Sequence, residues 1–334
     1  MENGMIEKQN DGGSVALNDG PKSSKMKKRI ISGALYVVIL LAFYLLKLFV
    51  PDWGKIPLGD FCFDILIYAF ALIGTFEMLR AVKDKTTTAE RVIVGIFSVV
   101  CIPACAVAEA FFTFGLHVIS VLFVVTAVAL ISLLVIRYDE TNMENLGTAF
   151  FSAAYPTLLL CILVLSNHAL ELEGLAQVKF NSDLLILFIF VISPLSDCFA
   201  FLVGFSLKPF FPKKFAPKIS PNKTLVGAIG GLIGGLIGAA IIYFVYGWLF
   251  VGSFENMAFW LPVYLIIGVA TAAATEFGDL VESCIKRKVG IKDMGNIMPG
   301  HGGILDRIDG TLFASVVVYL AFVALRAIFG VLSV

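Results

Sequence analysis

Nine apolar segments of membrane-spanning length dominate this sequence of 334 residues. A helix needs about 20 apolar residues to cross the hydrocarbon core of a bilayer, and each segment is close to that length. Hydrophobic residues make up 59% of the chain and charged residues 15%, and the mean hydropathy is +0.92, which excludes an ordinary soluble domain. We therefore predict an all-α polytopic integral membrane protein. The segments lie near 31–50, 61–79, 92–109, 116–136, 148–167, 183–205, 225–247, 257–279 and 310–332.

The first 28 residues differ from the rest because they are polar and end in a basic cluster. Asn, Gly, Ser, Lys and Asp dominate this segment without apolar periodicity, which is typical of a disordered tail. A signal peptide is the competing interpretation, but the apolar run at 31–50 is too long and lacks a small-residue cleavage site. We predict a tail over 1–28 and a single transmembrane domain over 29–334.

Lys and Arg residues are divided unequally between the two sets of loops that nine helices would place on opposite sides of a membrane. Lys55 and Lys179 fall in one set, Lys47 and Arg326 lie within spans, and the rest of the 25 Lys and Arg residues fall in the other set. Because basic loops stay in the cytoplasm, this bias predicts a cytoplasmic N-terminus and an outer C-terminus. The two long basic loops 206–224 and 280–309 then share the cytoplasmic side of the plasma membrane, which favours a polyanionic substrate.

The stretch Ser283–Gly310 is rich in charged residues and glycines. Mixed charges and glycines suit a site that holds phosphates and a divalent metal, whereas the simpler interpretation is a solvated basic loop. Asp279 precedes the stretch and shares a helix face with Glu276, three residues earlier. Asp306 and Asp309 are also three residues apart, at the start of the last helix. Helix capping is the alternative to metal binding for these two aspartates.

The sixth span carries Ser196 and Asp197 near its cytoplasmic end. A charged side chain inside a membrane helix is costly, so Asp197 points to function, with a buried structural hydrogen bond as the alternative. Pro194 should break or kink this helix and free backbone groups that line a cavity. His301 is the only histidine in a polar cytoplasmic segment, and phosphate contact, proton transfer and loop structure are all open for it.

Glycines in the seventh span recur at four-residue spacing. Such ladders let helices approach closely in lipid. Tight packing within the chain is the favoured use of these glycines, and a homodimer face is the alternative. The two ladders are Gly227, Gly231 and Gly235, and Gly230, Gly234 and Gly238.

The residues from Ser283 to Asp309 read S-x-I-K-R-x4-K-D-x-G-x2-M-P-G-H-G-G-I-x-D-R-I-D, which closely resembles the signature of phosphatidate cytidylyltransferases. Ser196-Asp197 followed by Gly204 resembles a second motif of that family, and the segment APKISPNKT at 216–224 resembles a third. The resemblance covers about residues 190–325, the expected catalytic part, while the earlier helices agree in hydropathy alone. The chain departs from the family pattern at Leu225-Val226, where Trp-Glu is usual.

The resemblance implies an enzyme that transfers CMP from CTP to phosphatidic acid, giving CDP-diacylglycerol and pyrophosphate. It implies Mg²⁺ as the cofactor, held by Asp279 and Asp306, and a membrane lipid rather than a nucleic acid as partner. The residues implied for catalysis are Asp279, Asp306, Lys292, Arg307 and Asp309. The residues implied for substrate binding are Ser196, Asp197, Ser220, Lys223, Ser283, Lys286, Arg287, Asp293 and His301.

Three other functions are compatible with parts of the sequence. A CTP-dependent lipid kinase would pass the γ-phosphate to a polyprenol-type alcohol. A transporter or channel would use the intramembrane acids as a pathway, although these acids cluster at helix ends rather than at mid-membrane. A scaffold without activity is the third, because of the departure at Leu225-Val226.

Overall fold

The computed structural model describes residues 21–170, 180–251, 257–298 and 302–332. Within these residues, nine helices are long and apolar enough to cross a membrane, which confirms the prediction of an all-α polytopic membrane protein. The spans are Ile31–Phe49, Leu58–Ala81, Thr88–Phe112, Gly115–Ile136, Met143–Asn167, Ser182–Leu207, Leu225–Leu249, Met257–Lys288 and Leu305–Phe329.

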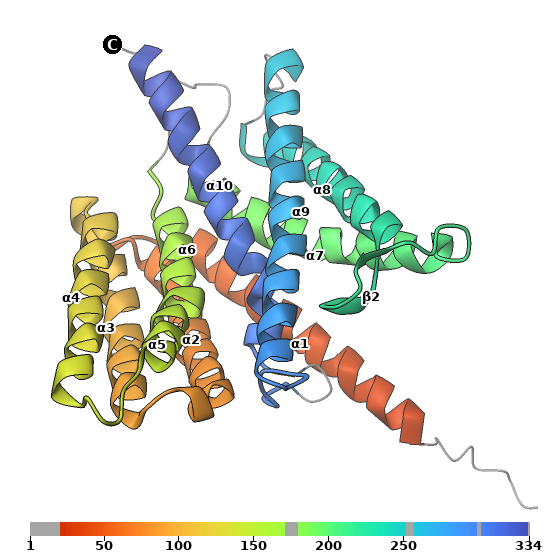
Figure 1. The fold of residues 1–334 in the computed structure, drawn as a ribbon. Coiled ribbons are helices and arrows are strands. Elements are labelled where there is room, and N and C mark those ends of the chain that lie inside the picture. Colours follow the sequence, from red (N-terminus) through yellow and green to blue (C-terminus); the bar gives the residue numbers. More distant parts are fainter. Residues whose placement is uncertain (1–20, 171–179, 252–256, 299–301, 333–334) are drawn as a thin grey trace, which may run out of the picture.

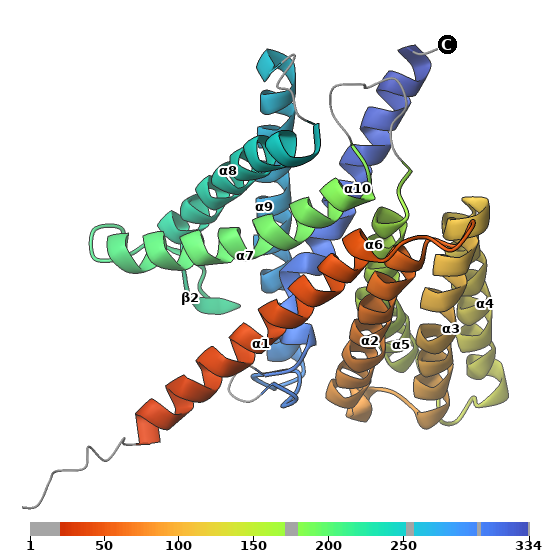
Figure 2. The ribbon, with the colours of Figure 1, turned by 180° about the vertical axis from the view of Figure 1, so that it is seen from behind.

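Figure 1 shows the helices in two groups. The N-terminal group, on the left, consists of α2 (Leu58–Ala81), α3 (Thr88–Phe112), α4 (Gly115–Ile136), α5 (Met143–Ala153) and α6 (Leu159–Asn167). The C-terminal group consists of α7 (Ser182–Leu207), α8 (Leu225–Tyr246), α9 (Met257–Lys288) and α10 (Leu305–Leu332). The remaining helix α1 (Pro21–Phe49) runs diagonally across both groups and lies in front in Figure 2.

Short elements complete the chain. A 3₁₀ turn, η1 (Lys83–Lys85), precedes α3, and a π-helical segment, η2 (Ala154–Leu158), joins α5 to α6 into one span. A second π-helical segment, η3 (Gly247–Val251), follows α8. Between α7 and α8, strands β1 (Lys214–Ala216) and β2 (Ser220–Thr224) form an antiparallel hairpin within the predicted basic loop 206–224.

Three helix boundaries differ from the sequence predictions. α1 begins at Pro21, inside the segment predicted as a tail, because the Lys and Arg residues that follow are good helix formers. α9 continues past residue 279 to Lys288, so the start of the Ser283–Gly310 stretch is helical. Basic residues in the last turn of α9 favour this extension because they interact well with the helix dipole. α7 continues through Pro194, so of the predicted break or kink the break is wrong, and the kink stays a prediction.

The glycines of α8 are used for packing on both sides. A Cβ atom at Gly234 would lie 2.8 Å from the carbonyl oxygen of Leu195 on α7. A Cβ atom at Gly235 would lie 2.7 Å from the carbonyl oxygen of Gly268 on α9. Because these distances leave no room for a side chain, the prediction of tight packing within the chain is confirmed. The homodimer stays a prediction.

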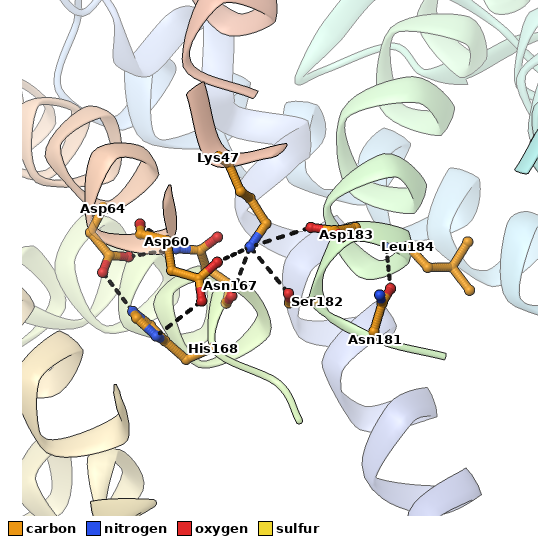
Figure 3. Close-up of polar contacts among 9 residues, drawn as sticks. All are labelled: Lys47, Asp60, Asp64, Asn167, His168, Asn181, Ser182, Asp183 and Leu184. Carbon is orange, nitrogen blue, oxygen red and sulfur yellow. Dashed lines mark hydrogen bonds and ion pairs between the residues drawn. The ribbon is translucent and has the colours of Figure 1, made fainter. Parts of the chain in front are cut away.

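A buried polar cluster joins the two groups of helices where α2 and α7 begin (Figure 3). Lys47, at the end of α1, forms an ion pair with Asp60 on α2. Its ammonium group also donates to the Ser182 hydroxyl, 3.1 Å away, and to the carbonyl oxygen of Asn167, 3.2 Å away. Asp183 on α7 lies 3.5 Å from the same nitrogen. One buried lysine thus joins the end of α1 to the ends of α2, α6 and α7.

His168 extends this cluster beneath Lys47 (Figure 3). Its Nε2 atom lies 2.6 Å from Asp64 Oδ2, and Asn167 Nδ2 donates to Asp64 Oδ1 over 2.9 Å. Asp64 is therefore satisfied by two neighbouring residues at the end of α6, as a buried carboxylate requires. The cluster lies at the ends of α2 and α7 opposite to those that reach the site described next.

Candidate active site

A cavity of about 490 Å³ lies between α7, α8, α9 and the β-hairpin. Its polar lining includes Asp197 from α7, Lys223 from β2, and Glu276 and Asp279 from α9. Its apolar lining includes Phe201 and Phe205, whose rings are stacked with centroids 6.1 Å apart, and also Ala200, Gly204 and Phe215. A cavity with charged groups in an otherwise apolar wall suits a ligand that is itself partly polar and partly apolar.

The β-hairpin and the cap of α8 position Lys223. Thr224 is the N-cap residue of α8, and its hydroxyl oxygen accepts the Gly227 N–H over 3.1 Å. Leu225 N–H donates to the carbonyl oxygen of Lys213 over 2.9 Å, which closes the hairpin. Leu225 and Val226, where the chain departs from the family pattern, are thus the first residues of α8, directly after Lys223.

Asp279 is contacted through both of its carboxylate oxygens. Lys223 Nζ lies 2.5 Å from Oδ2, and the Ser283 hydroxyl lies 3.3 Å from Oδ1. Lys223 comes from the hairpin and Asp279 from α9. The fold thus brings together a residue that the family resemblance implies for substrate binding and one that it implies for metal binding. Asp197 faces the same cavity from α7.

Lys286 and Asp306 form a second, more buried centre. Lys286 Nζ lies 2.7 Å from Asp306 Oδ1 and 2.5 Å from Glu282 Oε2. Asp306 Oδ2 accepts the N–H groups of Met294 and Gly303, each over 2.8 Å. Asp306 therefore fixes the loop before α10 to the end of α9, and it does not line the 490 Å³ cavity.

Asp309 lies where α9 and α10 cross. Its Oδ1 accepts the N–H of Gly310 over 2.7 Å. A side chain at Gly278 on α9 would overlap the Asp309 carbonyl oxygen, so the two helices touch through their backbones here. This close approach brings Asp309 beside the helix turn that carries Asp279.

Ser196 is completely buried rather than exposed to the cavity. Its Oγ atom and Glu276 Oε1 have no hydrogen-bond partner among the described residues. A Cβ atom at Gly231 on α8 would lie 3.0 Å from Ser196 Oγ and would overlap the Glu276 carboxylate. Ser196 and Glu276 thus approach α8 from α7 and α9, and of the two only Glu276 lines the cavity.

The other residues implied for substrate are placed around the cavity and the loop. Arg287 Nε lies 3.5 Å from the Ile219 carbonyl oxygen, between the end of α9 and the hairpin. Ser220 begins β2 and is half-buried. Lys292, Asp293 and Arg307 are exposed, and His301 lies outside the described residues.

Magnesium usually takes one or two carboxylates from a protein and fills its other positions with water and phosphate. Asp279 and Asp197 line the same cavity and supply oxygen donors of that kind, so the residues present fit the ion. Both oxygens of Asp306 are occupied by Lys286 and backbone N–H groups. Within the described ranges, no group of three or more His, Cys, Asp and Glu side chains is already arranged as a metal site.

Two buried glutamates of this region were not selected from the sequence. Glu276 lines the cavity, and Glu282, fully buried, contacts Lys286. The cost of charge inside a membrane helix was the signal that could have identified both. Glu276 was assigned to the correct helix face, and Glu282 lies four residues before Lys286, the spacing of a helical ion pair.

The sequence matches the cytidylyltransferase family over residues 27–325. It is 30% identical to phosphatidate cytidylyltransferase of Bacillus subtilis over 295 residues, which cover 88% of this chain and 96% of that protein. The same enzyme of Haemophilus influenzae is 36% identical over 140 residues, 42% of this chain and 46% of that protein. That of Staphylococcus saprophyticus is 33% identical over 185 residues, 55% of this chain and 65% of that protein. Because the match includes the early helices as well as the site, the chain belongs to the cytidylyltransferase family.

Proposed function

We propose that this protein transfers CMP from CTP to phosphatidic acid, giving CDP-diacylglycerol and pyrophosphate. Membership of the cytidylyltransferase family and similarity to phosphatidate cytidylyltransferases support this reaction. The observation that carries it is the Lys223–Asp279 pair in a cavity whose remaining walls are largely apolar. A phosphate group and a cation can be bound at the pair while a lipid tail contacts the apolar walls.

The chemistry requires two anions to approach one another. An oxygen of the lipid phosphate attacks the α-phosphorus of CTP, a new P–O bond forms, and pyrophosphate leaves with the electrons of the broken bond. The attacking phosphate is already ionised, so no strong general base is needed. Positioning and charge compensation are therefore the main tasks of the protein. Magnesium, when bound, would neutralise charge on the triphosphate and on the leaving pyrophosphate.

Two lysine–aspartate pairs are proposed to be central to substrate and metal binding. Lys223 pairs with Asp279, and Lys286 pairs with Asp306. Phosphate oxygens would draw each ammonium group toward the substrate and leave its aspartate free for a cation. Asp279 is the proposed principal metal ligand, supported by Asp309 and Asp197, and Asp306 can contribute once Lys286 is released. Lys292, Arg287, Arg307 and His301 are proposed to bind phosphates of the nucleotide.

The lipid is proposed to enter between helices. Phe201 and Phe205 of α7 are 69% and 75% exposed and lie at the wall of the cavity. In a bilayer, such side chains face lipid rather than water, so acyl chains can reach the charged groups without crossing the aqueous phase. This arrangement favours a membrane-embedded phospholipid as acceptor.

We also propose that the site faces the cytoplasm of a plasma membrane, with the N-terminus inside and the C-terminus outside. The bias of Lys and Arg between the loops supports this orientation. Cysteines introduced at Lys55 and at Lys213 should react differently with an impermeant thiol reagent added to whole cells. Labelling of the Lys55→Cys variant alone is expected, and labelling of Lys213→Cys alone would reverse the orientation. The homodimer and the absence of a nucleic-acid partner stay predictions.

A labelled-nucleotide assay tests the reaction. The full-length protein in vesicles is incubated with phosphatidic acid and CTP labelled at the α-phosphorus, with and without Mg²⁺. Label on the lipid together with release of pyrophosphate is the expected result. Transfer of label from γ-labelled CTP to a lipid alcohol, with CDP released, would instead identify a lipid kinase. Absence of both reactions would favour a scaffold or a transporter.

A further inference from the structure

Glu77 of α2 reaches the start of α10 from the other group of helices. Its side chain is buried, with 2% of the residue surface exposed. Its Oε1 atom accepts the Ile304 N–H over 3.1 Å, and Oε2 accepts the Leu305 N–H over 2.9 Å. The first N–H groups of a helix have no partner within the helix, so Glu77 satisfies two such groups of α10.

The loop before α10 is shaped around this carboxylate. A Cβ atom at Gly295 or at Gly303 would overlap the Glu77 carboxylate, so a side chain at either position would displace it from its present place. The two backbones also approach each other, since a Cβ at Gly295 would lie 3.1 Å from the Gly303 Cα. The carboxylate thus lies against two points of the loop that joins α9 to α10, Gly295 and Gly303.

This contact continues into the site. Gly303 N–H donates to Asp306, and Asp306 pairs with Lys286 on α9. Lys292 on the loop and Arg307 in the first turn of α10 have exposed side chains that are proposed to bind phosphates. The positions of these two cations depend on the backbone that Glu77 holds.

Helix capping alone accounts poorly for Glu77. Asp306 already supplies a carboxylate to the Gly303 N–H at the same helix start. A second buried carboxylate beside the first adds like-charge repulsion and the cost of desolvation. Glu77 does cap α10, but its carboxylate also lies against Gly295 in the loop, a contact that capping does not require.

We propose that Glu77 is a positioning residue for cytidylyl transfer, fixing the backbone of residues 289–298 and 302–308 so that Lys292 and Arg307 are held for the nucleotide phosphates and Asp306 for the cation. This role rests on the proposed function. Glu77 acts through the loop and touches no substrate. The N-terminal group of helices thereby contributes directly to the geometry of a site whose other residues come from α7 to α10.

The test compares Glu77→Gln with Glu90→Gln in the full-length protein. Glu90 is also buried and also caps a helix, because its Oε2 accepts the Thr87 N–H in the capping box of α3, away from the site. In each variant one acceptor oxygen becomes an NH₂ group, which cannot accept a hydrogen bond. Glu77→Gln must lose one of its two accepted hydrogen bonds, whereas Glu90→Gln can keep its single one, because the other oxygen of Glu90 has no partner among the described residues. Glu90→Gln therefore controls for the loss of a buried carboxylate away from the site.

We expect Glu77→Gln to lower kcat/KM for CTP by about 10- to 100-fold, because small displacements of positioning groups have effects of that size. Hydrogen exchange in peptides covering 302–308 should become about tenfold faster, while Glu90→Gln leaves both quantities near wild type. Glu77→Asp should restore part of kcat/KM, since it keeps both acceptor oxygens.

Two results would overturn the proposal. One is a Glu77→Gln enzyme with the same CTP kinetics as Glu90→Gln. The other is lost activity with unchanged exchange over 302–308, since the loop would then not be the route of the effect. If the wild-type protein itself transfers no CMP, the proposed function fails, and the exchange measurement alone decides whether Glu77 fixes the loop.

Discussion

Lys223 on the β-hairpin and Asp279 on α9 form an ion pair of 2.5 Å in the cavity between α7, α8 and α9. Their side chains are 26% and 33% exposed. At such exposure an ion pair contributes only about 0–1 kcal/mol to stability. Because the pair contributes so little to stability, we infer that its role is to bind a phosphate group and a cation.

Asp279→Asn should lower kcat by at least ~100-fold, the usual loss when one electrostatic group of an active site is removed. The amide keeps the size of the side chain but is a poor ligand for Mg²⁺, so the dependence of the rate on Mg²⁺ concentration should also weaken. Initial rates with α-labelled CTP measure both effects. Asp139→Asn is the control, because Asp139 is exposed in the turn between α4 and α5. Near-normal turnover of Asp279→Asn would remove the metal assignment.

Lys223→Met and Asp279→Asn should not have additive effects on kcat/KM. Residues that act as one unit share their contribution, so the double variant should be little worse than the poorer single variant. Steady-state kinetics of the four proteins in the cycle measure the coupling. If the fold-losses in kcat/KM of the two single variants multiply in the double variant, the two residues act on separate steps or on separate ligands.

Lys286→Met should destabilise the fold as well as the reaction. It leaves the carboxylates of Glu282 and Asp306 buried without their cation, a change that costs about 3–5 kcal/mol. Thermal unfolding of the detergent-solubilised protein should therefore begin at a clearly lower temperature. Lys288→Met is the matched control, since Lys288 is exposed in the same last turn of α9. Equal unfolding temperatures for the two variants would contradict the buried pair.

Lys47→Met tests the cluster that joins the two groups of helices. Removing the ammonium group leaves Asp60 without its ion pair and removes donors to Ser182 and the Asn167 carbonyl. A partly buried carboxylate that loses its cation is destabilising, so the unfolding temperature should fall. Lys55→Met, at an exposed position between α1 and α2, should leave it unchanged. CTP kinetics of the folded fraction should stay near wild type, because the cluster lies at the opposite helix ends.

The sequence predicted the nine spans because hydropathy and span length are local properties. It could not predict the end of α9 at Lys288, since the charges of that segment lower its hydropathy while its pairing with α10 keeps it helical. The contact of Glu77 with the loop before α10 could not be predicted for a related reason. A carboxylate in the second span indicates a hydrogen-bonding partner nearby. Which group is that partner depends on how α2 contacts a loop more than two hundred residues later.

The sequence predicted several residues of the site but not which of them contact each other. The charged signature identified Asp279, Lys286 and Asp306 because they lie in or beside one short stretch. Which acid meets which base follows from helix crossings, so the pairs Lys223–Asp279 and Lys286–Asp306 required the fold. The four-residue glycine spacing in α8, by contrast, did predict that α8 packs closely against other helices of the chain, which are α7 and α9.

Gly235→Ala should separate α8 from α9. The new methyl group would lie 2.5 Å from the Ala272 Cβ and 2.7 Å from the Gly268 carbonyl oxygen, closer than any real contact, so the helices must move apart. Overpacking of this kind costs about 1–3 kcal/mol. Because α8 begins directly after Lys223, the Lys223–Asp279 pair should loosen and kcat/KM should fall together with the unfolding temperature.

Gly95→Ala on α3 supplies the control for this substitution. A Cβ atom at Gly95 meets nothing within 4 Å, so alanine should fit without strain. Since alanine favours a helix over glycine by about 0.5–1 kcal/mol, this variant should be at least as stable as the wild type. The two glycine-to-alanine changes are chemically identical and differ only in what surrounds them. If both left stability and kinetics unchanged, the contact between α8 and α9 would be looser than the structure has it, and the glycine ladder would not be what sets the distance between Lys223 and Asp279.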